Sequence, residues 1–145
     1  RLTLYDAMAG HTVGELMRRG VPAVASDLSI AVLVRDHMLQ SDSHAFPVLH
    51  EGQLVGLVTL ADVRLVPQER WSTTPVARAM RSGDALAVAR PDEALGEAFE
   101  ELARRDVGQL PVLDHGQLVG MLRRSDVARW LELTWSPQRE GATHP

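Results

Sequence analysis

A hydroxyl and a carboxylate stand three residues apart at Thr59 and Asp62, directly after an apolar run and at the start of a helical pattern. This spacing favours a capping box, in which Thr59 accepts a backbone N–H of the first turn and Asp62 accepts the N–H of Thr59. The same groups also suit a nucleotide. A helix start that carries a hydroxyl favours phosphate, and an ionised carboxylate can accept two ribose hydroxyls at once. Both interpretations stay open, because one structure can contain both.

A second motif of this kind keeps the carboxylate, as Asp126, but has Arg123 in place of the threonine. Arg123 has two interpretations. It is either a solvated side chain or a guanidinium whose planar fork binds a phosphate with two hydrogen bonds. In either case we expect the two candidate sites to differ in ligand or in affinity.

The two motifs belong to a tandem repeat. Residues 44–63 (HAFPVLHEGQLVGLVTLADV) and 108–127 (GQLPVLDHGQLVGMLRRSDV) are identical at ten of twenty positions, at a spacing of 64 residues. Upstream, TVGELM at 12–17 matches PVARAM at 75–80 more weakly, at a spacing of 63. Self-similarity of this kind indicates that one supersecondary unit occurs twice.

Each copy predicts the order strand, helix, strand, strand, helix. Short extended runs are expected at 24–25 and 86–89, with helix N-caps at Ser26 or Asp27 and at Asp92. Gly-containing hairpin loops are expected at 50–53 and 114–117. Pro67 should keep the last helix of the first copy short, whereas its counterpart can run to about Trp135. The predicted divisions are a lead-in at 1–11, copies at 12–66 and 75–135, a linker at 67–74 and a flexible tail at 136–145.

Composition narrows the classes of function. The net charge of −4 and the aromatic content of 4% argue against nucleic acid as a partner. The absence of Cys excludes disulfides and thiolate metal sites. The six His show no metal-ligand spacing, and no nucleophile–base motif occurs, so we expect neither a metal site nor catalysis in this fragment. No apolar run is long enough to span a bilayer, and the start at Arg1 indicates an excised part of a longer chain.

The tandem PVLxxGQLVG pattern, followed in each copy by DV and in one copy carrying Thr59-x-x-Asp62, resembles a pair of CBS domains, or Bateman module, over about residues 12–134. The resemblance implies an α/β (α+β) fold of two βαββα repeats around a pseudo-twofold axis, with two clefts between them. It also implies binding of an adenosine-containing ligand (AMP, ADP, ATP or S-adenosylmethionine) and frequent homodimerisation.

The resemblance assigns site residues by position. In the first cleft Thr59 would hold phosphate and Asp62 ribose. Its walls would come from Ala23, Val24, His44, Phe46 and Pro47. In the second cleft Asp126 would hold ribose, and Arg123 departs from the Ser or Thr that the family prefers at this position. The second walls would come from Ala87, Val88, Gln109, Leu110 and Pro111.

A narrower resemblance concerns the parent chain. Residues 69–81 and 103–131 look like the cytosolic regulatory region of membrane zinc metalloproteases of the site-2-protease type. This implies a cytoplasmic module without direct membrane contact of its own, tethered to the inner face of a membrane, with zinc only in the parent's protease domain. Our hypothesis is a module that senses an adenosine-containing ligand and controls the attached protease. The alternative is a ligand-free dimerisation or interaction module.

Overall fold

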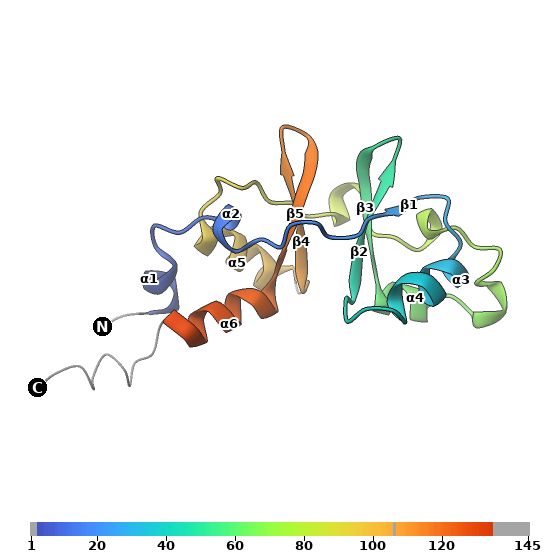
Figure 1. The fold of residues 1–145 in the computed structure, drawn as a ribbon, viewed down its shortest axis with the longest axis horizontal. Helices are drawn as coiled ribbons and strands as arrows, with labels where there is room; N and C mark the ends of the chain where they lie inside the picture. Colours follow the sequence, from blue (N-terminus) through green and yellow to red (C-terminus); the bar gives the residue numbers. More distant parts are fainter. Residues whose placement is uncertain (1–2, 106, 135–145) are drawn as a thin grey trace, which may run out of the picture. The chain divides into compact units, whose positions relative to one another are not determined.

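The computed structural model describes residues 3–105 and 107–134, and the chain in it divides into two compact units (Figure 1). The first-copy unit comprises residues 20–87 together with 116–118, and the second-copy unit comprises residues up to 19, 88–115 and from 119 onward. The fold is mixed α/β, as the repeat predicts, and each unit carries one βαββα motif.

The first-copy unit is a three-stranded sheet with helices after β1 and β3. The short β1 (Val24–Ala25) runs parallel to β2 (Ala45–His50), which pairs antiparallel with β3 (Gln53–Thr59). Helix α3 (Ile30–Leu33) continues as a π-helical turn at Val34–Met38, and α4 (Leu60–Arg64) follows β3 directly. Short 3-10 turns occupy Gln68–Arg70, Val76–Arg78 and Gly83–Ala85.

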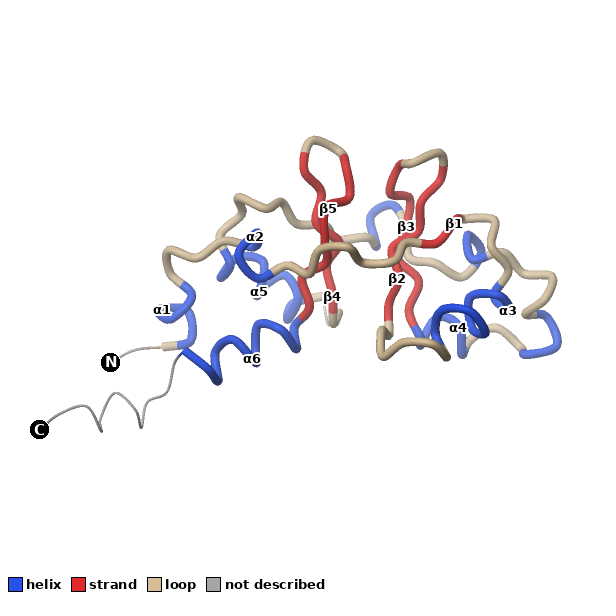
Figure 2. The backbone as a smooth tube through the Cα atoms, in the orientation of Figure 1, coloured by secondary structure: helices blue, strands red, loops and turns tan. Residues whose placement is uncertain are grey.

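The second-copy unit repeats this arrangement around the hairpin of β4 (Gln109–Asp114) and β5 (Gln117–Arg123) (Figure 2). Where the first copy has β1, a single residue, Ala89, forms a parallel bridge to Val112. The helices are α1 (Leu4–Met8), α2 (Val13–Leu16), α5 (Leu95–Arg104) and α6 (Arg124–Thr134).

The two cores are built from corresponding residues. Val48, Val58 and Val63 are buried in the first-copy unit. Their counterparts at the repeat spacing, Val112, Leu122 and Val127, are equally buried. The hydrophobic pattern that repeats in the sequence is therefore the inward-facing pattern of each unit.

The first residues of each copy pack into the unit of the other copy. Val76, at the start of the second copy, belongs to the core of the first-copy unit, whereas Val13, at the start of the first copy, lies in the second-copy unit and is fully buried. We call residues 11–19 and 74–82 the exchanged segments. The sequence boundaries 12–66 and 75–135 stay predictions for the copies, and the predicted tail at 136–145 lies outside the described residues.

The exchanged segments also correct two predicted helix starts. The N-cap of α3 is Ser29 rather than Ser26 or Asp27, and that of α5 is Ala94 rather than Asp92. Each helix begins where a carbonyl of an exchanged segment accepts its first N–H. Thr74 accepts from Ile30 at 2.9 Å, and His11 accepts from Leu95 at 2.9 Å. At α3 the Ser29 side chain also accepts the N–H of Val32 at 3.2 Å, whereas α5 has no side-chain cap and its start depends on the tertiary contact alone.

Other local predictions are confirmed, with one exception. Both hairpins have two-residue turns, with positive φ at Glu51 (51°) and His115 (50°). Helix α4 ends before Pro67, as predicted. Helix α6 reaches Thr134, and Trp135 lies outside the described residues. The exception is the extended run at 86–89, which is reduced to the bridge at Ala89.

Each exchanged segment makes a close backbone approach to one strand, residues 11–19 to β5 and residues 74–82 to β3. Arg18 bridges Met121 with hydrogen bonds of 2.8 and 2.9 Å, and Arg81 bridges Leu57 with the same two lengths. A Cβ on Gly120 would lie 2.6 Å from the carbonyl oxygen of Arg18, and one on Gly56 would lie 2.7 Å from that of Arg81. Only glycine leaves room for the bridge at these two positions.

We therefore expect Gly120→Ala to lower the free energy of unfolding by about 1–3 kcal/mol, because the backbone of Arg18 must move away from β5. Thermal and urea denaturation followed by circular dichroism measure the change. Gly108→Ala is the matched control, because a Cβ there meets no atom within 4 Å. An equal loss in both variants would contradict the assigned role of the close approach.

Candidate functional site

The Thr59–Asp62 motif lies at the junction of β3 and α4. The N–H of Asp62 donates to Thr59 Oγ1 at 3.2 Å, and the N–H of Thr59 donates to Asp62 Oδ2 at 2.9 Å. The capping-box interpretation is therefore confirmed. The box uses one lone pair of the hydroxyl and one carboxylate oxygen, so the Thr59 O–H and Asp62 Oδ1 retain capacity for another partner.

Two further groups surround this motif. The carbonyl of His44 accepts the N–H of Leu60 at 2.8 Å, which holds the start of β2 against the start of α4. Arg81 Nε lies 3.6 Å from Asp62 Oδ1, an ion pair longer than a hydrogen bond. The sequence analysis did not single out Arg81, which reaches the site because its backbone bridges β3.

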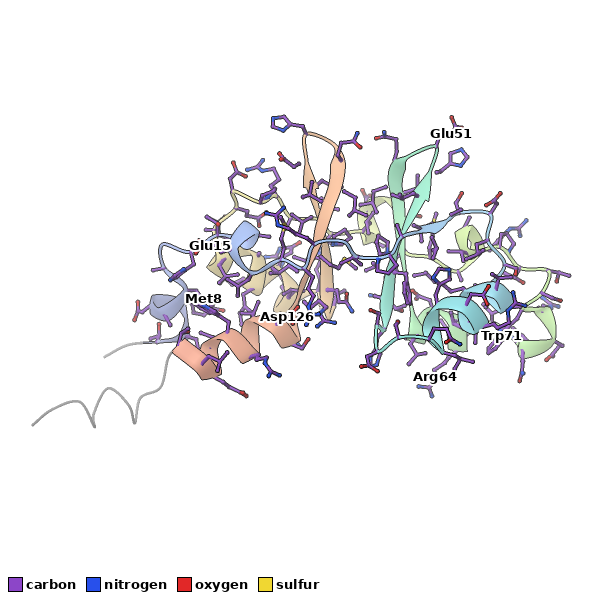
Figure 3. The ribbon with its side chains drawn as sticks, in the orientation of Figure 1. Met8, Glu15, Glu51, Arg64, Trp71 and Asp126 are labelled. Atoms are coloured by element: carbon purple, nitrogen blue, oxygen red, sulfur yellow. The ribbon has the colours of Figure 1, made fainter. Side chains whose placement is uncertain are left out.

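In the second copy, the corresponding carboxylate, Asp126, lies in the first turn of α6 (Figure 3). Two guanidinium groups hold it. Arg123 donates from Nε to Oδ2 at 2.8 Å and from Nη2 to Oδ1 at 3.0 Å. Arg18 donates from Nε to Oδ2 at 3.1 Å and from Nη2 to Oδ1 at 3.2 Å. Each oxygen thus accepts from both arginines. We call these three residues the arginine clamp.

The sequence analysis did not assign Arg18 to a site, and the structure brings it to one. Its backbone follows α2 and bridges β5, and its side chain pairs with a residue 108 positions away. One sequence signal could have identified Arg18 as a site residue. The weak match of residues 12–17 to 75–80, continued by one residue, aligns Arg18 with Arg81. Both exchanged segments therefore bring an arginine to the carboxylate of the copy that they complete.

The clamp shifts the ionisation of its members. The hydrogen bonds from Arg123, supported by those from Arg18, hold the pKa of Asp126 below its usual range, although partial burial opposes this shift. In return, the hydrogen bond to Asp126 raises the pKa of Arg123. Asp126 is therefore a carboxylate at neutral pH, and it already has two charged partners.

The predicted wall residues differ in exposure. Val24, Phe46 and Leu110 are core residues, and Pro47 and Pro111 are also buried. Ala23, Ala87 and Gln109 are half-buried, whereas His44 and Val88 are exposed. Strand pairing places Ala45, next to His44, opposite Thr59. His44 is thus the predicted wall residue that the structure brings nearest in register to the Thr59–Asp62 motif.

The described residues were also compared with the requirements of a metal site and of a membrane-spanning helix. Within residues 3–105 and 107–134, no group of three or more His, Asp or Glu side chains could hold a metal ion. None of the helices in these same ranges has both the length and the apolar character needed to cross a membrane.

The two units and their matching carboxylate sites define a tandem α/β module. The family model of the CBS domain matches residues 13–69 and 73–133, so the chain belongs to the CBS domain family. The sequence resemblance to a CBS-domain pair is thereby confirmed.

Curated relatives place this module in several contexts. The chain is 32% identical over 93 residues to the CBS domain-containing protein YhcV of Bacillus subtilis, covering 63% of this chain and 65% of that protein. It is 27% identical over 135 residues to the putative zinc metalloprotease Rip3 of Mycobacterium tuberculosis, covering 92% of this chain and 34% of Rip3. The chain thus spans under two thirds of YhcV and about a third of Rip3.

Solved structures share the fold. A crystal structure of CBSX2 in complex with AMP matches with a TM-score of 0.76 and 25% identity, covering 86% of this chain and 98% of CBSX2. The CBS domain pair of MJ0100, in complex with 5′-methylthioadenosine and S-adenosylmethionine, matches with a TM-score of 0.72 and 19% identity, covering 83% and 95% of the two chains. The second likeness concerns the fold alone.

The lowered pKa of Asp126 predicts a pH dependence of stability. A carboxyl whose pKa is depressed on folding stabilises the fold above its unfolded pKa, and the contribution is lost as pH falls through the folded value. We expect Asp126→Asn to cost about 1 kcal/mol at pH 7, the upper end for partly exposed pairs. Urea titrations of both proteins at pH 7 and pH 3 measure the difference. A difference that persists unchanged at pH 3 would contradict the role of the charge.

Proposed function

We propose that this chain is a regulatory module that binds an adenosine-containing ligand at the Thr59–Asp62 motif. The observation that carries the proposal is the remaining hydrogen-bonding capacity of this motif. Among the described residues, Asp62 Oδ1 has one partner, in a 3.6 Å ion pair, and the Thr59 hydroxyl can still donate. A family member with 25% identity is known in complex with AMP, which supports the choice of ligand class.

In this proposal Asp62 accepts ribose hydroxyls and Thr59 donates to a phosphate or to another polar group of the ligand. His44, Ala23 and Pro47 flank the base in the first copy, with Val24 and Phe46 supporting them from the core. The second copy would use Asp126 and Arg123, with Ala87, Val88, Gln109, Leu110 and Pro111 around the base. AMP, ADP, ATP and S-adenosylmethionine are the candidate ligands.

The proposal assigns regulation rather than catalysis to this chain. We further propose that the regulated partner is a membrane zinc metalloprotease in the same polypeptide, so that the module lies at the cytoplasmic face of a membrane. The match to Rip3 over 92% of this chain supports this proposal. Zinc would belong to the protease domain alone.

We also propose that the module forms a homodimer, as CBS-domain pairs often do. Within the described residues of the first-copy unit, Leu39 and Leu65 leave 73% and 83% of their surface exposed, and these apolar side chains could contact a second copy. If no ligand binds, this dimerisation or interaction role becomes the function of the chain.

Calorimetric titration with each of the four ligands tests the proposal. We expect at least one ligand to bind to the wild-type protein, and Asp62→Ala to weaken that binding about tenfold or more by removing the ribose acceptor. We expect Asp126→Ala to weaken it less, because the clamp already engages Asp126. Binding of none of the ligands at millimolar concentration, or equal effects of the two variants, would argue against this assignment.

Asp62→Ala also breaks a capping box, so stability needs its own control. Asp6→Ala removes the same kind of box at α1, where Thr3 and Asp6 cap each other on the exposed surface. Both variants should lose about 1 kcal/mol of stability. Ligand affinity should fall in Asp62→Ala and stay at the wild-type value in Asp6→Ala, as measured by titration of the folded variants.

The proposed parent makes a separate prediction about the full-length chain. Its remaining sequence should contain an HExxH motif on a membrane-spanning helix, because the zinc protease needs two His and a general base. Sequencing the complete gene decides this point. A full-length chain without such a motif would remove the protease from the proposal and leave the ligand-binding module unaffected.

A further inference from the structure

The carboxylates of the two candidate sites, Asp62 and Asp126, have different electrostatic surroundings. Asp62 lies near one guanidinium, that of Arg81, so the pair is formally neutral. Asp126 lies between the guanidinium groups of Arg18 and Arg123, so the clamp carries a net charge of about +1. A ligand that reaches the second site therefore meets a positive cluster, whereas one at the first site does not.

The clamp also leaves Asp126 without free acceptor capacity. A carboxylate offers about four lone-pair positions, and the four hydrogen bonds from the two arginines fill them. A ribose diol can bind Asp126 only after at least one guanidinium has left. The arginine that leaves loses a charge-assisted hydrogen bond and needs another anion in its place.

The two arginines are not held equally. The side chain of Arg18 is 57% exposed, whereas that of Arg123 is 23% exposed. The Arg18 hydrogen bonds are also the longer ones, at 3.1 and 3.2 Å against 2.8 and 3.0 Å. Solvent screens an exposed pair most, so Arg18 is the member that a ligand displaces at least cost.

We infer that the arginine clamp is a charge-selective latch, which admits a nucleotide to the second site only when its phosphates replace Asp126 as the partner of Arg18 and Arg123. The inference rests on the proposed function and specifies the ligand class of one of its two sites. A phosphate-bearing ligand exchanges one anion for another, whereas an uncharged nucleoside must break the clamp without compensation. The first site, with Thr59 in place of Arg123, makes no such demand.

Calorimetric titration of the wild-type protein with adenosine and with ATP tests the latch without any mutation. We expect one equivalent of adenosine per chain, bound at the first site, and two equivalents of ATP. The second ATP equivalent should weaken with added salt more strongly than the first, because it relies on two charged groups. Two equivalents of adenosine with similar affinities would overturn the inference.

Variants then assign the selectivity to the clamp. Arg123→Thr recreates the Thr-x-x-Asp motif of the first copy, and Arg18→Met removes the second charge but keeps a long side chain. We expect the double variant to gain a second equivalent of adenosine and to bind the second ATP about tenfold or more weakly. Arg19→Met is the matched control, an exposed arginine on the same segment that should behave as the wild type.

The outcomes separate the two proposals. If neither adenosine nor ATP binds to the wild-type protein, the latch fails, and the proposed function fails with it if AMP, ADP and S-adenosylmethionine do not bind either. If both bind but the double variant keeps the wild-type stoichiometry and affinities, the latch alone fails. Circular dichroism of each variant checks folding, and the wild-type comparison remains decisive if a variant does not fold.

Discussion

A single backbone bridge in each unit determines much of the surrounding structure. The segment at the start of each sequence copy runs beside a strand of the other copy, β5 or β3, and exchanges two hydrogen bonds with it, Arg18 with Met121 and Arg81 with Leu57. The bridge requires glycine on the neighbouring strand position, because a side chain there would collide with a carbonyl oxygen. It also carries Val13 and Val76 into the two cores. The same residues that form the bridge, Arg18 and Arg81, then direct their side chains to the carboxylate at the following helix.

One difference between the copies changes the chemistry of that carboxylate. Where the first copy has Thr59, Asp62 completes a capping box by accepting the backbone N–H of Thr59. The other oxygen of Asp62 forms a 3.6 Å ion pair with Arg81. With Arg123 at the corresponding position, Asp126 instead accepts hydrogen bonds from side chains on both of its oxygens. The two copies share the same backbone arrangement, but one arginine lies near Asp62 and two lie at Asp126, so the net charge of the two sites differs. This difference is the basis of the proposed selectivity for phosphate-bearing ligands at the second site, although the strands and turns of the two copies are identical at half of their positions.

The sequence predicted the features whose signals are local. Turn residues flanked by apolar runs predicted the two hairpins. A short extended run predicted β1, and Pro67 predicted that α4 is short. A spacing of three residues predicted the Thr59–Asp62 capping box. The start of α5 and the role of Arg18 could not be predicted in the same way, because their partners lie far along the chain. Asp92 is a good capping residue by type, but the carbonyl of His11 decides where α5 begins. The partner of Arg18 is 108 residues away, and only the weak spacing of 63 between the two exchanged segments hinted at it.

The anchoring of Arg18 explains how a latch can open without unfolding the unit. The main chain of this residue is fixed by its two hydrogen bonds to Met121, and its side chain is fixed separately by Asp126. A ligand that takes the guanidinium changes the second set of contacts and leaves the first in place. The backbone of the exchanged segment then stays on β5, with Val13 still in the core, while the charge around Asp126 is rearranged. In the proposed latch, binding therefore alters the electrostatics at one end of the exchanged segment at little cost in packing, because the backbone bridge and Val13 stay in place.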